Sequence, residues 1–234
     1  METGKTSKYF KYAIGEIILV VIGILIALQI NNWNENRKSQ KAKTQYYEQL
    51  FEEIELDIKG IDGQLKRLEG DIISYNTYEA IYETSNISLD TIYKNIKKLP
   101  SIYDQASFNT KTIEVLKSTG DIKLFPNKIQ TLLVALETLQ GTYKTYTDAN
   151  YGIYLNLVDD AYLMNVLSIE SKLANQEPFA KALDFKKKLP DQLAKQHLAF
   201  AMKNYADKNA SVTLKGVLET VNKLKSLVKK KLEN

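Results

Sequence analysis

The sequence predicts an all-α protein in which a single N-terminal transmembrane helix is followed by a helical stalk and an antiparallel helical bundle. A nineteen-residue stretch of almost entirely apolar residues, residues 12–30, lies near the N-terminus. Apolar residues then recur at helical spacing through most of the chain, and no segment shows the alternation that is typical of strands. Ten Gly and four Pro in 234 residues leave long segments uninterrupted.

Composition argues against most catalytic chemistry. The absence of Cys removes disulfides, thiolate zinc sites, iron–sulfur clusters and cysteine nucleophiles. The single histidine, His197, allows no site that needs two imidazoles, and it is expected to lie in the core or at its boundary. Glu-x-x-His pairs, Walker A loops and GxGxxG loops are all absent from the sequence. We therefore expect no enzymatic activity, no cofactor and no metal site.

Residues 12–34 are the predicted transmembrane helix with its interface, and residues 1–11 form a short basic tail before it. Nineteen residues at 1.5 Å rise span roughly 28 Å, close to the hydrocarbon thickness of a bilayer. Tyr9, Tyr12 and Trp33 are expected to anchor the two interfaces. A cleaved signal peptide is disfavoured because no clear small-x-small cleavage site follows the stretch. The alternative is a buried core helix.

The orientation of this helix depends on a near tie in flanking charge. Three lysines precede the helix, whereas Arg37, Lys38, Lys41 and Lys43 follow it. A short basic tail usually stays in the cytoplasm, and a long following domain is translocated largely regardless of its charge. We expect an inner (cytoplasmic) membrane protein with a cytoplasmic N-terminus and a periplasmic C-terminal domain.

Two features of the helix are candidates for function. Glu16 is an acidic residue near the membrane entry, where ionisable groups are functional candidates, although a carboxylate at the interface, snorkelling or paired with Lys8 or Lys11, is the simpler interpretation. Gly15, Gly23 and Ala27 form a strip of small residues that would let two membrane helices approach closely. Small residues also occur by chance in such helices, so the strip alone leaves association open.

The string GEIILVVIGILIALQINNWNENRK, residues 15–38, resembles the N-terminal signature of an uncharacterised family of small single-pass membrane proteins common in Bacteroidota, a domain of unknown function. Residues 115–124, VLKSTGDIKL, are similar to the family's middle motif, a helix that ends in a Ser/Gly turn before a second helix. The resemblance implies a helical, non-enzymatic protein of the inner membrane, and it supplies no catalytic residues.

The predicted stalk, residues 35–84, carries a heptad seam. Its apolar residues alternate in steps of three and four, as in a coiled coil; they are Phe51, Ile54, Ile58, Ile61, Leu65, Leu68 and Ile72. Acidic residues beside the seam, among them Glu53 and Asp57, are expected on the solvated face. Because Gly60 and the glycines that follow it weaken a helix, we expect a kink or break near Gly60 or just after Trp33.

Residues 85–234 are predicted to form a helical bundle that packs with the stalk. Ser88 is expected to cap a helix that stops before Pro100, and Gly120 to end a helix that begins at Asn109 or Thr110. Asn127 is the expected N-cap of a long helix. A short helix between Pro178 and Pro190 and a last helix from about Asp191 to Leu232 complete the bundle.

Two residue groups in the bundle invite a functional interpretation. Tyr143, Tyr146, Tyr151, Tyr154 and Tyr162 could line a groove for a sugar or peptide, but core packing with hydroxyls at the rim is the simpler interpretation. The C-terminal lysines, Lys223 to Lys231, are more simply a solvated face that complements the helix dipole than a nucleic-acid site. We expect no nucleic-acid partner.

These features favour a membrane-anchored structural or assembly protein. Its expected partners are the lipid bilayer and either further copies of itself or another membrane or envelope protein, because an uncovered seam would be costly. The alternative is a helical ligand-sensing module that signals through a partner in the membrane, since the cytoplasmic tail is too short to carry an output domain.

Overall fold

The computed structural model describes residues 3–83, 86–165 and 176–233, and over these residues the chain is helical without strands. Helix α1 (Thr3–Ala80) ends in the 3₁₀ turn η1 (Ile81–Glu83). Two short helices, α2 (Leu89–Ile96) and α3 (Lys111–Thr119), and the 3₁₀ turn η2 (Asp121–Leu124) follow. Helices α4 (Asn127–Asn165), α5 (Glu177–Leu183) and α6 (Phe185–Leu232) complete the chain.

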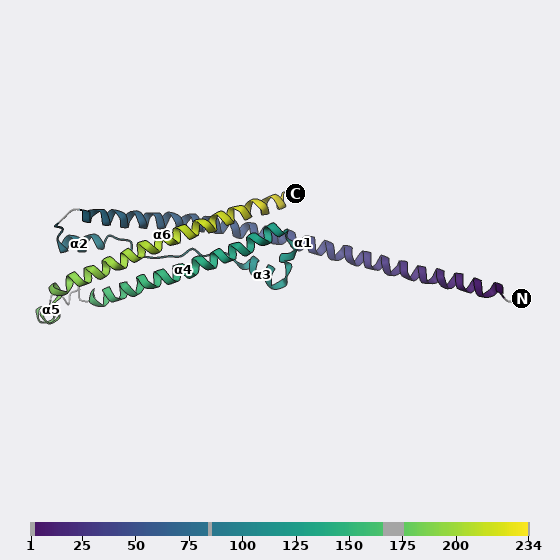
Figure 1. Ribbon diagram of the computed structural model, residues 1–234, viewed down its shortest axis with the longest axis horizontal. Coiled ribbons are helices and arrows are strands. Elements are labelled where there is room, and N and C mark those ends of the chain that lie inside the picture. The colour runs from purple at the N-terminus through teal and green to yellow at the C-terminus, as the bar shows by residue number, and fades with distance from the viewer. Residues whose placement is uncertain (1–2, 84–85, 166–175, 234) are drawn as a thin grey trace.

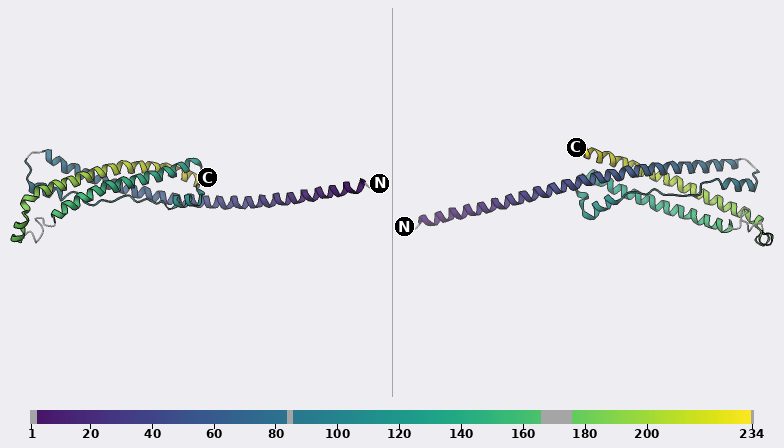
Figure 2. Two further views of the ribbon diagram at one scale, coloured as in Figure 1. Left: turned by 60° about the horizontal axis from the view of Figure 1, so that its bottom comes forward. Right: turned by 180° about the vertical axis from the view of Figure 1, so that it is seen from behind.

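Three long helical segments build the bundle, and the N-terminal half of α1 projects from one end of it (Figures 1 and 2). Helix α6 packs antiparallel to both α4 and the second half of α1. Helix α2 packs against α6 at the end far from the projecting segment, and α3 lies near the point where α1 leaves the bundle. The expected all-α architecture, with one long apolar N-terminal helix, is confirmed.

The kink or break expected near Gly60 or after Trp33 is wrong, because α1 is one helix of 78 residues. Gly60 is exposed, and a glycine in a helix costs about 1 kcal/mol relative to Ala. The adjacent Ile61 is 0% exposed, and burial of one such side chain contributes about 1.5–3 kcal/mol. Beyond Trp33, the Arg37 guanidinium lies 5.4 Å from the indole centroid, one turn along the helix.

The helix ends largely follow the expected local chemistry. The Ser88 hydroxyl accepts a hydrogen bond from the Thr91 N–H (3.2 Å), and Gly120 ends α3 in the left-handed region with φ 75°. Helix α4 begins at Asn127, but the carbonyl of Pro126 accepts its first hydrogen bonds. The expected start of the last helix at Asp191 is wrong, since α6 begins at Phe185.

Pro190 therefore lies inside α6 rather than before it. Proline removes one hydrogen bond to the carbonyl four residues earlier and usually bends or ends a helix. Here the helix begins before the proline because the Asp184 carbonyl accepts hydrogen bonds from the N–H groups of Lys187 (3.1 Å) and Lys188 (3.3 Å). Just beyond the proline, Leu193 is buried against α1 and α2, which holds the following turns in place.

The heptad seam of α1 is covered within the chain. Ile54, Ile61 and Leu68 are at most 3% exposed and belong to a core that includes Leu133 of α4 and Leu214 of α6. The other seam residues of this core, Phe51, Ile58 and Leu65, are half-buried; Ile72 is half-buried too. The seam is thus used to assemble the bundle, and it leaves no long apolar stripe for a second chain to cover.

Candidate functional site

The projecting half of α1 is the largest apolar surface of the described chain. Every residue from 16 to 33 is exposed, and an 18-residue window of this helix has a mean hydropathy of 2.6 with none of it buried. Its length and composition are sufficient to cross a membrane. No part of the bundle lies beside this segment in any view (Figures 1 and 2).

The residues singled out on this segment whose side chains the structure describes are not part of the buried core. Gly23 and Ala27 are exposed and Gly15 is half-buried; a Cβ added at Gly15 or Gly23 would meet nothing within 4 Å. Glu16 is exposed, and its expected pairing with Lys8 or Lys11 involves side chains outside the described residues. Trp33 is 65% exposed. Tyr9 and Tyr12 lie in α1, but their side chains are outside the described set.

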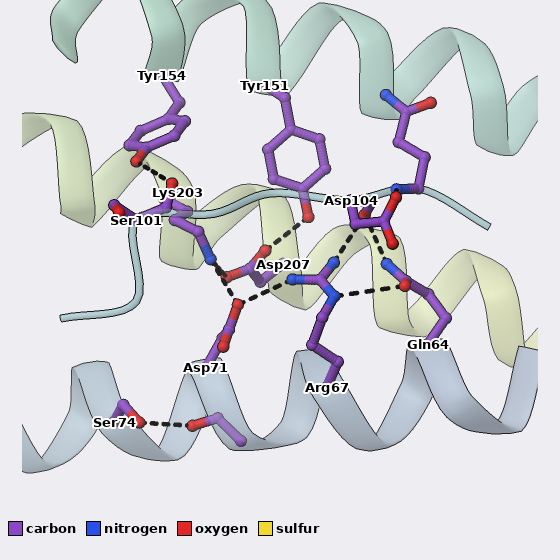
Figure 3. A network of polar contacts seen from close by, with 12 residues as sticks. Gln64, Arg67, Asp71, Ser74, Ser101, Asp104, Tyr151, Tyr154, Lys203 and Asp207 are labelled. Atoms are coloured by element: carbon purple, nitrogen blue, oxygen red, sulfur yellow. Dashed lines mark hydrogen bonds and ion pairs between the residues drawn. The ribbon is translucent and has the colours of Figure 1, made fainter.

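Within the bundle, residues 101–110 form a segment that we call the strap, which runs lengthwise between α1 and α4 (Figure 3). The Tyr154 hydroxyl donates to the Ser101 carbonyl (2.8 Å), and the Tyr143 hydroxyl accepts from the Ala106 N–H (3.1 Å). The eleven residue steps from Tyr143 to Tyr154 in α4 therefore span the same distance as the five steps from Ser101 to Ala106 in the strap. At 1.5 Å per helical residue that distance is roughly 16 Å. It corresponds to about 3.3 Å per strap residue, the rise of an extended backbone.

On the other side of the strap, polar residues of α1 bind its backbone. The Asp104 carbonyl accepts from Gln64 Nε2 (2.6 Å) and from an Arg67 guanidinium N–H (2.7 Å). The Asp57 carboxylate accepts from both the backbone N–H (2.9 Å) and the side-chain amide (2.7 Å) of Asn109. Because an extended segment that lies between two helices has no neighbouring strand, these side chains supply hydrogen bonds that a sheet would otherwise provide.

Asp57 corrects one sequence expectation, because it lies under the strap and is only 4% exposed instead of facing solvent. Burial raises the pKa of its carboxyl, and the two hydrogen bonds from Asn109 only partly offset that effect. Glu53, one turn earlier, is half-buried and accepts from the Thr112 N–H (3.1 Å) at the start of α3. Burial raises the pKa of the Glu53 carboxyl as well.

The raised pKa of Asp57 gives a pH-dependent prediction. A carboxyl whose folded-state pKa exceeds its ordinary value of 3.8 binds a proton more tightly when folded. Its contribution to stability is therefore complete below pH 3.8 and is lost as the pH rises through the folded-state pKa. We expect Asp57→Asn, which keeps the acceptor oxygen without the charge, to be more stable than wild type at pH 7.5. That advantage should shrink as the pH falls, in urea unfolding curves followed by circular dichroism.

Asp57→Leu is the control for this prediction, because it removes both the charge and the acceptor that the Asn109 N–H and side-chain amide use. It should be less stable than Asp57→Asn by about 1–3 kcal/mol at every pH in this range, because neither variant titrates at this position. An Asp57→Asn variant that is less stable than wild type at pH 7.5 would show that the buried charge is itself stabilising.

Beside the strap, four charged residues form a cluster that joins α1 to α6 (Figure 3); Lys203 and Asp207 are buried, and Arg67 and Asp71 are half-buried. Lys203 Nζ lies 2.7 Å from Asp71 Oδ2 and 2.8 Å from Asp207 Oδ2, and the Lys203 side chain is 3% exposed. Asp71 also accepts from Arg67 (3.0 Å). Tyr151 of α4 donates to Asp207 Oδ1 (2.6 Å), and burial together with the Asp207 charge raises the pKa of the tyrosine hydroxyl.

The cluster is suited to holding helices together rather than to chemistry. Its two cations and two anions are mutually paired, which is the condition under which buried charges are tolerated. The cavity that adjoins Asp71, Lys203 and Asp207 measures about 10 Å³, room for about one water molecule and not for a substrate. Among the described residues, no group of three or more His, Cys, Asp or Glu is arranged to hold a metal ion.

Sequence reasoning missed these polar residues. One face of α1 carries a polar residue every seven positions, at Asp57, Gln64 and Asp71, between the buried Leu50 and Tyr78. A seam identified from apolar residues alone does not include these positions. The signal that could have located them is this repeat of polar residues at core positions. In α6, Lys203 and Asp207 are a Lys–Asp pair four residues apart inside an apolar stripe, which is a second signal of the same kind.

The tyrosines of α4 divide between core and surface. Tyr143, Tyr151 and Tyr154 are at most 2% exposed, as the core interpretation expects, whereas Tyr146 is 59% exposed; the side chain of Tyr162 lies outside the described residues. His197 is exposed, and its Nδ1 lies 3.0 Å from the Tyr78 hydroxyl, at the boundary of the core. Of the lysines at the C-terminal end of α6, Lys223, Lys229, Lys230 and Lys231 are exposed, whereas Lys225 is half-buried and paired with Glu55.

Comparison with known proteins identifies a family but no activity. No curated protein and no solved structure matches the chain. The family model described as "Family of unknown function (DUF6090)" matches residues 16–175, which run from the start of the apolar segment to beyond the end of α4. Since this match covers more than half of the 234 residues, the chain belongs to the DUF6090 family, a family of unknown function.

Proposed function

We propose that the protein is a membrane-anchored structural or assembly protein, whose helical extramembrane domain oligomerises or binds another envelope protein. The observation that carries the proposal is the exposed apolar surface of residues 16–33, on a helix that continues unbroken into the bundle. An apolar surface of this extent needs a cover of lipid or protein. The paired buried charges and closed core of the bundle favour a binding role over catalysis.

The proposed location is the inner membrane, with the N-terminus in the cytoplasm and the bundle in the periplasm. The supporting observation is the short basic tail before the apolar segment, which usually stays cytoplasmic. A reporter that is active only in the periplasm, fused after the C-terminus, should be active. Activity of a cytoplasm-only reporter at the same position would reverse the orientation.

The strip of small residues on the exposed helix provides the test of assembly. In-cell crosslinking of the wild-type chain should give a product with a second copy or with another envelope protein. Gly23→Leu fills the strip, and it should reduce crosslinking between membrane helices severalfold, because close approach of such helices depends on small side chains. A Cβ at Gly23 would meet nothing within 4 Å and the residue is exposed, so the bundle should be unaffected.

Val21→Leu is the matched control, because it enlarges a side chain of the same helix on roughly the opposite face. It should leave the crosslinks unchanged. If the detergent-solubilised wild-type protein is a strict monomer with nothing co-purifying, the assembly proposal is wrong.

The alternative, a ligand-sensing module that signals through a membrane partner, is favoured by one observation. Helix α1 joins the exposed apolar segment to the bundle without a break, so a shift in the bundle would reach the segment directly. This alternative predicts a small molecule that raises the melting temperature of the full chain and changes its crosslinking pattern. A melting temperature that no small molecule in a metabolite panel alters would count against it.

A further inference from the structure

A run of basic residues follows the exposed apolar segment of α1. We call it the basic belt; its members are Arg37, Lys38, Lys41 and Lys43. None of residues 34–46 is buried, and three members of the belt are exposed while Lys43 is half-buried. The belt therefore lies on the projecting part of α1, between the apolar segment and the bundle (Figure 1).

The height of the belt above the proposed membrane is fixed, because α1 is one helix from the apolar segment to the bundle. With Trp33 at the interface, Arg37 lies roughly 6 Å and Lys43 roughly 15 Å further along the axis, at 1.5 Å per residue. The headgroup layer of a bilayer is about 5–8 Å thick. Electrostatic attraction extends about 8 Å beyond it at physiological ionic strength. The whole belt therefore lies within reach of charged headgroups.

The side chains of the belt lean back toward the apolar segment. In an α-helix the Cα–Cβ bonds tilt toward the N-terminus, which in α1 is the direction of that segment. The Arg37 guanidinium accordingly lies 5.4 Å from the Trp33 ring centroid, and Lys38 Nζ lies 3.1 Å from Glu35 Oε1. Glu35 is the only acidic residue between Glu16 and residue 48, so the belt keeps a net positive charge.

Beyond the belt the charge of α1 changes sign. Residues 44–58 contain no basic residue, and their acidic residues are Glu48, Glu52, Glu53, Glu55 and Asp57. A charged face that serves only for solubility has both signs interspersed. Here the positive charges are next to the apolar segment and the negative charges are further from it. An anionic membrane surface attracts the first group and repels the second, whereas an uncharged surface would distinguish neither.

We propose that the basic belt binds the phosphates of anionic phospholipids in the leaflet next to Trp33. Juxtamembrane basic segments are attracted to anionic lipids, and a guanidinium such as that of Arg37 pairs with a phosphate through two parallel hydrogen bonds. The inference rests on the proposed membrane anchoring and deepens it, because it names the class of lipid and the surface that binds it. It holds for either orientation of the chain, since the belt follows the apolar segment in both.

Trp33 is the single tryptophan of the chain, so its fluorescence reports the lipids beside the belt. The test places the full chain in nanodiscs of phosphatidylcholine and phosphatidylglycerol at one fixed ratio, with an equal amount of bromine carried by either one lipid or the other. Brominated phosphatidylglycerol should quench Trp33 about two- to fivefold more strongly, because one basic residue near an anionic surface is equivalent to about fivefold in a binding constant. The ratio of the two quenching efficiencies should approach one at about 1 M salt, where the screening length falls to about 3 Å.

The double variant Lys38→Gln, Lys41→Gln should bring this quenching ratio most of the way to one. Its matched control is Lys59→Gln, Lys66→Gln, which removes two exposed lysines of the same helix that lie roughly 39 Å or more beyond Trp33. The control should leave the ratio unchanged. Because all four lysines are exposed, neither double variant should alter the melting temperature.

Arg37 provides a finer test. Arg37→Lys keeps the charge and should keep the quenching ratio, whereas Arg37→Gln should lower it. The proposal is overturned if the two brominated lipids quench wild-type Trp33 equally, or if the control pair of lysines lowers the ratio as much as the belt pair.

Equal quenching by both lipids would overturn the belt alone, since it still places Trp33 in a bilayer. A chain that enters no nanodisc would overturn the belt together with the membrane anchoring. A photocrosslinking residue at position 41 supplies the check in cells, where it should capture lipid and not protein. Crosslinks to an acidic segment of another protein would overturn the lipid assignment in favour of a protein partner.

Discussion

Lys203→Met is expected to destabilise the bundle by about 3–5 kcal/mol, the largest effect of any single substitution that we predict. The Lys203 ammonium is the group shared by Asp71 on α1 and Asp207 on α6. Methionine has a similar length but no charge, so it leaves Asp207 buried with Tyr151 as its remaining polar partner. Urea unfolding of the full chain in detergent, followed by circular dichroism, measures the loss.

Two further variants test whether the loss of stability comes from leaving a buried charge without its partner. Lys203→Met combined with Asp207→Asn removes the uncompensated charge and keeps an acceptor for Tyr151, so it should recover most of the lost stability. Lys223→Met breaks another Lys–acid pair four residues apart in α6, Lys223–Glu219, whose side chains are 60% and 69% exposed. That variant should change stability little, because solvent screens exposed pairs. Equal losses at Lys203 and Lys223 would show that the buried cluster has no special role.

Ile61→Ala is expected to cost about 2–5 kcal/mol, because it removes buried methyl groups and leaves a cavity in the core that α1 shares with α4 and α6. Ile61 is 0% exposed. Ile73 is the matched control, since it is also an isoleucine of α1 but is 58% exposed. Ile73→Ala should change the free energy of unfolding by no more than about 0.5 kcal/mol.

The same pair of variants tests whether the heptad seam is buried within one chain or between two chains. Because Ile61 is already buried within one chain, the loss for Ile61→Ala should be the same at high and low protein concentration. A seam buried between chains would make stability depend on concentration by mass action. A loss for Ile61→Ala that grows on dilution would therefore contradict the intramolecular packing.

The sequence predicts the helices of this fold better than the packing between them. Apolar periodicity located α1, α4 and α6, and cap residues such as Ser88 and Gly120 located the short helices, because these signals act over a few residues. The break expected at Gly60 did not occur, since local propensity is weaker than burial of neighbouring side chains. The prediction that the last helix begins after Pro190 was wrong. The backbone hydrogen bonds to the Asp184 carbonyl that begin α6 do not depend on a particular residue type, so the sequence does not reveal them.

The polar interior was not predictable by hydrophobicity. Ile58, Leu65 and Ile72 looked like seam residues but are half-buried, whereas Asp57 and Gln64 lie deeper. These polar residues are stable in the core only because the strap brings backbone groups to them. An extended segment with no periodic pattern of its own gives no sign in the sequence that it will lie along two helices of a bundle.

The unbroken course of α1 has a mechanical consequence for the proposed anchoring. The helix from Trp33 to Ala80 is a lever roughly 70 Å long at 1.5 Å per residue, with no joint at the membrane surface. Transmembrane helices tilt by about 20° on average, and such a tilt displaces the far end of the lever sideways by about 24 Å. The neighbouring helices and interfacial side chains that set the tilt would thereby set the radius within which the bundle meets its neighbours.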